Sequence, residues 1–251
     1  MGLEPAERHG DSATSALDPH ATAALDQATA QVRAPWAASI AGLLFAAFFT
    51  TGLLLLRNSP LATSTDDGQI QRLFIDGHDW GLLLGALYLL PFAGIMFLWF
   101  IAVVRDQIGE REDQFFATVF FGSGLLFVAG LFATAAVSGS IVVRFRYLAL
   151  GPPTASEVDL VRSIAYALSF AVSTRAAAVF LLALSTVGLR SGTFPRWLVL
   201  TGYLLGVALM LVVSVWDWVV LILPAWVAVV SLYILRRERA RARRRTTRPA
   251  T

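Results

Sequence analysis

"FFATVFFGSGLLFVAGLFATAAVSGSIVV", residues 115–143, decides the fold class of this chain. The segment has no charged side chain, and it exceeds the about 20 residues with which an α-helix crosses a bilayer core of about 30 Å. Its apolar residues form one continuous run, whereas a membrane-spanning β-strand alternates apolar and polar residues. The segment therefore predicts a transmembrane helix.

Five more segments of the chain share this character. Each is long enough to cross a bilayer at about 1.5 Å per residue, and helices satisfy the backbone hydrogen bonds of such runs within lipid. The sequence thus predicts an all-α integral membrane bundle of six transmembrane helices. The predicted spans are residues 36–56, 80–104, 115–143, 160–189, 197–215 and 218–235.

The composition agrees with a membrane protein and excludes several kinds of site. Only 15% of the residues are charged, against about 25% in ordinary soluble domains, and 57% are hydrophobic. Cysteine is absent, which excludes disulfides, thiolate metal sites and cysteine catalysis. The basic excess lies in one tail beside a membrane span, so we do not interpret it as a nucleic-acid surface. The sequence indicates no cofactor.

The parts that flank the predicted bundle differ in composition. Residues 1–35 form a polar arm with few apolar side chains, which predicts a cytoplasmic and largely disordered segment. The alternative for part of this arm is a short helix that starts at Asp18-Pro19. The transmembrane domain follows at residues 36–235, and residues 236–251 form an Arg-rich cytoplasmic tail.

The tail sets the predicted orientation in the membrane. "RRERARARRRTTR", residues 236–248, holds eight Arg and one Glu directly after the last span, which predicts a cytoplasmic position. An even number of spans then places the N-terminus in the cytoplasm too. Seven of these arginines are candidates for contact with anionic lipid, with a plain topology anchor as the alternative. They are Arg236, Arg237, Arg239, Arg241, Arg243, Arg244 and Arg245.

The loop after the first predicted span contains a second helical pattern. In "TDDGQIQRLFIDGHDW", Thr65 or Asp66 is placed to cap a short helix that carries Ile70, Leu73 and Phe74 on one face. This pattern predicts a helix lying in the outer membrane interface.

A capping pattern also opens the fourth predicted span. In "GPPTASEVDL", residues 151–160, two prolines end the preceding structure, and Thr154 and Glu157 have the spacing of a capping box.

Carboxylates and one His gather in the outer loops, so we considered a metal site formed by His78, Asp79 and Asp217. One His with scattered carboxylates is a weak pattern for a metal, and helix capping explains these residues as well. No metal is predicted.

Arg175 lies near mid-depth in the fourth predicted span. Its side chain reaches roughly 6–7 Å, whereas the half-thickness of the bilayer core is about 15 Å, so it does not reach water easily. No predicted span contains a carboxylate to pair with it. Three interpretations remain open: a structural hydrogen-bonded knot, a cavity for an anionic ligand, or a pair with an acid on a partner membrane protein. The candidate ligand or partner residues are Arg175, Tyr88 and Tyr203.

Small residues indicate how the helices pack. Gly81 and Gly85 form a GxxxG motif on the second span, and Gly202 and Gly206 form another on the fifth. Such motifs let helix backbones approach, and we expect packing within the bundle rather than dimerisation. Pro91 lies inside the second span and is predicted to disturb its hydrogen-bond ladder.

Catalytic motifs are absent from the sequence. It contains no HExxH, no GxSxG and no P-loop. The stretch "FLWFIAVVRDQIGEREDQFFATVFFGSGLLFVAGLF", residues 97–132, resembles uncharacterised multi-span membrane proteins of high-GC Gram-positive bacteria. That resemblance implies a bacterial cytoplasmic membrane and no particular activity.

Three functional classes follow from these observations. The favoured prediction is a binding or accessory component of a membrane assembly, in contact with the lipid bilayer and with another membrane protein. The alternative is a small transporter for an anionic or amphipathic solute, with Arg175 in its pathway. An intramembrane enzyme is disfavoured because no set of nucleophile, base and metal is apparent.

Overall fold

The described residues of the computed structural model are helical and contain no strand; they are residues 19–59, 64–108, 114–192, 194–211 and 217–246. The chain divides into two units, Met1–Arg33 and Ala34–Thr251, and the architecture below is that of the second. The helices are α1 (Pro19–Arg57), α2 (Asp67–Ile75), α3 (Trp80–Leu82), α4 (Leu90–Ile108), α5 (Gln114–Arg146), α6 (Ala155–Ala167), α7 (Thr174–Arg190), α8 (Arg196–Leu211) and α9 (Ile222–Thr246). Three further helical turns join them: η2 (Leu83–Leu89), η3 (Leu168–Ser173) and η4 (Asp217–Leu221).

The predicted all-α membrane bundle is confirmed. In the described part of the chain, five helical segments are long and apolar enough to cross a bilayer. They correspond to the first four predicted spans and the last one within a few residues. These segments are Ala37–Arg57, Trp80–Arg105, Phe115–Arg146, Ala155–Arg190 and Trp218–Ala240.

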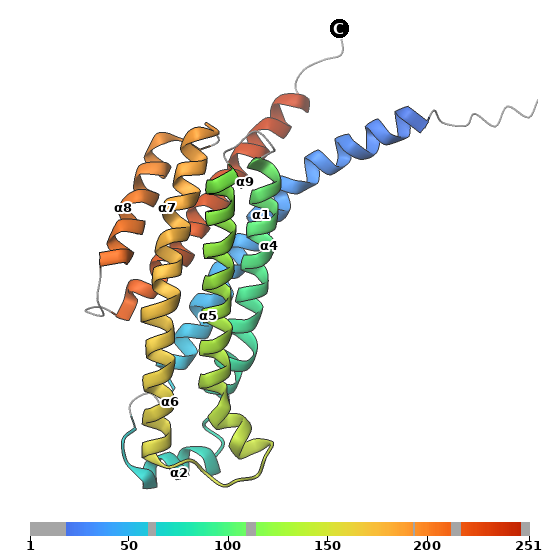
Figure 1. The fold of residues 1–251 in the computed structure, drawn as a ribbon. Coiled ribbons are helices and arrows are strands. Elements are labelled where there is room, and N and C mark those ends of the chain that lie inside the picture. The colour runs from blue at the N-terminus through green and yellow to red at the C-terminus, as the bar shows by residue number, and fades with distance from the viewer. Residues whose placement is uncertain (1–18, 60–63, 109–113, 193, 212–216, 247–251) are drawn as a thin grey trace, which may run out of the picture. The chain divides into compact units, whose positions relative to one another are not determined.

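The remaining predicted span, residues 197–215, corresponds to the shorter apolar helix α8. The helix covers about 24 Å at 1.5 Å per residue, and residues 212–216 lie outside the described part of the chain. α8 runs beside α7 in the bundle (Figure 1). A Cβ atom at Gly206 would lie 2.8 Å from the Leu182 side chain of α7, so the glycine permits this close approach.

The N-terminal arm is helical where the structure describes it. Pro19 is the first residue of α1, at the place where the alternative of a helix starting at Asp18-Pro19 puts it. Residues 19–33 are helical in the structure, residues 1–18 lie outside the described residues, and a largely disordered arm stays a prediction.

Phenylalanine rings fill the centre of the bundle. Phe97 lies 5.0 Å from Phe127 and 5.0 Å from Phe180, measured between ring centroids, so α4, α5 and α7 share one aromatic core. The Gly81–Gly85 motif packs inside this bundle, as expected. A Cβ atom at Gly85 would lie 2.9 Å from the Gly52 carbonyl oxygen, so η2 and α1 approach backbone to backbone.

Two membrane-spanning segments contain a π-helical turn, in which the backbone hydrogen bonds join residues five apart. η2 directly precedes Pro91, which has no N–H and whose ring crowds the carbonyl four residues earlier. The wider turn relieves that crowding, and the Leu90 N–H donates to the Gly85 carbonyl instead. Pro91 therefore widens its helix. The other π-turn, η3, directly precedes Arg175.

Candidate functional site

The helix α2 lies at one end of the bundle (Figure 1). A buried ion pair lies at this end. The Arg146 Nε atom donates to Asp79 Oδ2 at 2.8 Å, and a second guanidinium nitrogen donates to Oδ1. The Asp79 side chain is 0% exposed and that of Arg146 is 39% exposed. The two-point geometry compensates a carboxylate that has no contact with solvent, and it joins α3 to the end of α5.

The beginning of α6 is fixed at the same end. The predicted capping box is confirmed, because the Glu157 N–H donates to the Thr154 hydroxyl and the Glu157 carboxylate accepts from the Thr154 N–H. Arg144 of α5 also donates to Glu157. Asp67 of α2 accepts a bond from the Ala155 N–H, one of the first amides of α6. These bonds hold α2, α5 and α6 in register.

The helix α2 forms where it was predicted, with its apolar face directed at the protein. Asp66 caps it by accepting a hydrogen bond from the Gln69 N–H at 3.0 Å. Ile70 and Phe74 are buried, and the Phe74 ring lies 5.1 Å from that of Phe145 on α5. The interfacial helix that the sequence suggested therefore packs on the bundle.

The two metal candidates whose side chains the structure describes, His78 and Asp79, do not form a metal site. Both carboxylate oxygens of Asp79 accept hydrogen bonds from Arg146. His78 is exposed, and the Asp217 side chain lies outside the described residues. Within the described residues, no group of three or more His, Asp or Glu side chains has a metal-binding arrangement. Asp79 forms an ion pair with Arg146, so its carboxylate oxygens are not available to a metal ion.

A cavity of about 310 Å³ lies beside this end of the bundle, within the range of volumes that small-molecule sites have. α1, α5, α6 and η3 form most of its wall, with one residue each from α3 and η4. Tyr166 lines the cavity and is 41% exposed, so the space reaches the protein surface. The lining is mainly apolar: Leu53, Leu56, Leu82, Ile141, Val158, Val161, Ala165, Phe170 and Val220.

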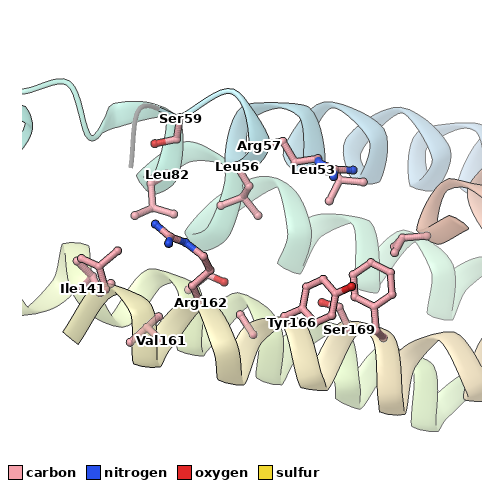
Figure 2. Close-up of a pocket in the computed structure, with 15 residues that line it drawn as sticks. Leu53, Leu56, Arg57, Ser59, Leu82, Ile141, Val161, Arg162, Tyr166 and Ser169 are labelled. Carbon is pink, nitrogen blue, oxygen red and sulfur yellow. The ribbon is translucent and has the colours of Figure 1, made fainter. Parts of the chain in front are cut away.

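The charged side chains that line the cavity are both arginines. Arg57 ends α1 and Arg162 lies on α6, so the two cations come from opposite walls (Figure 2). Arg162 donates to Asp159 at 2.7 Å and to the Ser64 carbonyl at 3.3 Å, which holds its guanidinium in place. The Arg57 guanidinium lies 4.8 Å from the centroid of the Trp218 ring. Asp159, which forms an ion pair with Arg162, does not line the cavity, so the two charged residues of the lining are both cations.

Hydroxyl groups add hydrogen-bonding capacity to the wall. Ser59, Ser138, Ser169 and Tyr166 line the cavity with the two arginines. The Ser59 hydroxyl is buried and has no hydrogen-bond partner among the described residues. A buried polar atom without a partner is uncommon and is normally explained by water or a ligand. The geometry thus combines apolar walls, two cations and an unsatisfied hydroxyl.

Arg175 is held by its own helix. One guanidinium nitrogen donates to the Phe170 carbonyl, which lies five residues earlier in the π-turn. Ser173 and Thr174 likewise bond the carbonyls five residues before them, at 3.1 Å and 2.9 Å. The candidate partners predicted for Arg175, namely Tyr88 and Tyr203, lie on other spans, whereas the hydrogen-bond acceptor in the structure belongs to η3.

The transport candidates do not share a cavity. Arg175 lines a groove between α5 and the η3–α7 segment, which includes neither Tyr88 nor Tyr203. The Tyr203 hydroxyl pairs with the Thr186 hydroxyl at 2.8 Å, and Tyr88 is 47% exposed on η2. The three candidates therefore lie at separate places in the described structure, and the transporter that would use them stays a prediction.

The tail arginines continue the last helix. α9 extends through the tail to Thr246, and Arg236, Arg237 and Arg239 are exposed on it. The side chains of residues 241–246 are outside the described part of the structure, so lipid contact by the tail stays a prediction. The cavity and its two arginines were missed by the sequence analysis. A signal was present, since Arg57 follows the first predicted span and Arg162 lies near the beginning of the fourth, on the same predicted side of the membrane.

The chain matches no family model, no curated protein and no solved structure in the comparisons. Its function must therefore be inferred from the geometry of its own side chains.

Proposed function

We propose that this chain is a multi-pass binding protein of a bacterial cytoplasmic membrane that holds an amphipathic anion, such as a molecule with one alkyl chain and a carboxylate or phosphate head group. The observation that carries the proposal is the charge of the cavity lining: apolar residues with Arg57 and Arg162 as the charged groups. An apolar wall accommodates an alkyl chain, and guanidinium groups recognise carboxylate and phosphate oxygens.

From the predicted orientation we infer that this cavity lies in the outer half of the membrane. The Arg-rich tail favours a cytoplasmic C-terminus. With both termini cytoplasmic, Arg57 and Arg162 lie near the outer surface, at the depth of the lipid head groups. An amphipath from the outer leaflet then needs only a lateral movement to enter. Reporter fusions at residues 30 and 245 test the orientation, and a periplasmic signal at either position would contradict it.

Binding of a fluorescent long-chain fatty acid to the purified full-length chain tests the cavity. We expect saturable binding, and we expect the double variant Arg57→Gln/Arg162→Gln to raise the dissociation constant at least about tenfold, because it removes both cations. Arg72→Gln is the matched control. Arg72 is an exposed arginine of α2 at the same end of the bundle, and it does not line the cavity.

A neutral analogue separates recognition of charge from filling of an apolar space. The fatty alcohol of the same chain length should bind much more weakly than the acid to the unmodified protein. Equal binding of the alcohol and the acid, together with no effect of the double variant, would show that the cavity takes only an alkyl chain and would refute the proposed anion site.

A further inference from the structure

A second feature, which shares no lining residue with the cavity, is the groove that contains Arg175. The groove has a volume of about 520 Å³ and lies between α5 and the η3–α7 segment. Gly122 and Leu126 of α5 and Val172 of η3 line it and are exposed, so it is an open surface of the bundle. Arg175 is the only charged residue in its lining.

The depth of Arg175 excludes an ordinary contact with lipid head groups. It lies 15 residues from Arg190 and 13 residues from Arg162, which corresponds to about 22 Å and about 20 Å along the helix. An arginine side chain covers only roughly 6–7 Å of such a distance. The groove therefore presents a cation where the surrounding lipid offers alkyl chains.

The charge of Arg175 is uncompensated in the described structure. Its one hydrogen bond goes to the neutral Phe170 carbonyl, and no described carboxylate forms an ion pair with it. The same π-turn satisfies two other carbonyls with the neutral hydroxyls of Ser173 and Thr174. A hydrogen bond to the turn thus does not require a cation at this position.

We infer that this groove docks a transmembrane helix of another protein that carries one Asp or Glu near mid-membrane. The missing charge must come from outside this chain, because none of its predicted spans contains an Asp or Glu. A symmetric contact with a second copy would place Arg175 against Arg175. Gly122 contributes no side chain, which leaves room for a helix to approach closely.

The test uses full-length protein in zwitterionic vesicles and a labelled model transmembrane peptide, built from Leu and Ala with one central Asp. We expect this peptide to bind about tenfold more tightly than the same peptide with Leu at the centre. Arg175→Leu should abolish the difference, and Arg175→Lys should retain part of it because the charge remains.

A second variant guards against a folding defect in the Arg175 variants. Gly122→Trp leaves Arg175 intact and fills the groove, and a Cβ atom at Gly122 meets no atom within 4 Å, so we expect normal folding with weakened peptide binding. Leu204→Trp is the matched control, since Leu204 is 70% exposed on α8 and remote from the groove lining. It should bind the Asp peptide as the unmodified chain does.

Three results would overturn the inference. One is equal affinity of the unmodified protein for the Asp and Leu peptides. Another is unchanged discrimination between the two peptides in both Arg175→Leu and Gly122→Trp. The third is displacement of the Asp peptide by anionic phospholipid, dependent on Arg175, which would assign the groove to a lipid instead. These outcomes are independent of fatty-acid binding at the Arg57–Arg162 cavity, so either proposal can fail alone.

Discussion

The ion pair between Asp79 and Arg146 predicts an asymmetric response to mutation. The Asp79 side chain is fully buried, whereas that of Arg146 is 39% exposed. Replacing Arg146 by Met therefore leaves a carboxylate without compensation and without water, a change that costs about 3–5 kcal/mol in the free energy of unfolding. Replacing Asp79 by Asn leaves an arginine that water can reach, and the amide still fills the site. We expect a loss of about 1–2 kcal/mol for that variant.

The measurement is the thermal unfolding midpoint in one detergent for four proteins: unmodified, Asp79→Asn, Arg146→Met and the double variant. Arg146→Met should lower the midpoint at least twice as far as Asp79→Asn. The double variant should recover part of the loss seen in Arg146→Met, because it no longer buries a charge. Arg144→Met is the control at the same end of α5. Both side chains of its pair with Glu157 are partly exposed, so we expect a loss below about 1 kcal/mol.

The predicted asymmetry is wrong if Asp79→Asn lowers the unfolding midpoint as far as Arg146→Met does. It is also wrong if the losses of the two single variants simply add in the double variant. Either result would mean that burial of Asp79 does not determine the energy of this pair. A loss for Arg144→Met as large as that for Arg146→Met would show that the whole helix end responds to any change of charge.

Three further predictions follow from local contacts. Gly85→Ala should destabilise the bundle by about 1–3 kcal/mol, because its Cβ atom would lie 2.9 Å from a carbonyl oxygen of α1, whereas Gly122→Ala should be neutral in the same thermal assay. Thr154→Ala removes the cap of α6 and should lower stability by about 1 kcal/mol, and an unchanged unfolding midpoint would contradict a contribution from the cap. The isolated peptide of residues 236–251 should bind anionic vesicles at low salt and lose binding at high salt, and salt-independent binding would rule out an electrostatic contact.

Local patterns in the sequence were enough to predict most of the helices. Apolar runs depend only on consecutive residues, and the capping box at Thr154 and the cap at Asp66 depend on residues three apart. Each pattern is stabilised mainly by its own neighbours in the chain, so it survives in the folded protein. The predicted span for α8 ends at residue 215, whereas the described helix ends at Leu211 and residues 212–216 lie outside the described structure.

The charge pairing and the cavity could not be predicted in the same way. Asp79 and Arg146 are 67 residues apart in sequence, and Asp79 had local interpretations as a helix cap or, on a weaker pattern, as a metal ligand. Arg57 and Arg162 line the same cavity only because α1 and α6 face each other across it (Figure 2). Whether apolar side chains fill such a space depends on how several helices pack, which periodicity does not encode.

Arg175 differs from three other arginines of the bundle in the partner of its guanidinium group. Arg144 and Arg146 lie at the end of α5 and Arg162 lies on α6, and each has a carboxylate of this chain within salt-bridge distance. Arg175 lies deepest, where a charge is most costly, and it has a carbonyl instead. A central arginine costs about 2.5–3.5 kcal/mol on the insertion scale, while a neutral hydrogen bond contributes about 0.5–1.5 kcal/mol. The bond to Phe170 therefore does not offset the cost of the charge. Ser173 and Thr174 make the equivalent bonds without any charge, so the positive charge itself requires an explanation outside the π-turn.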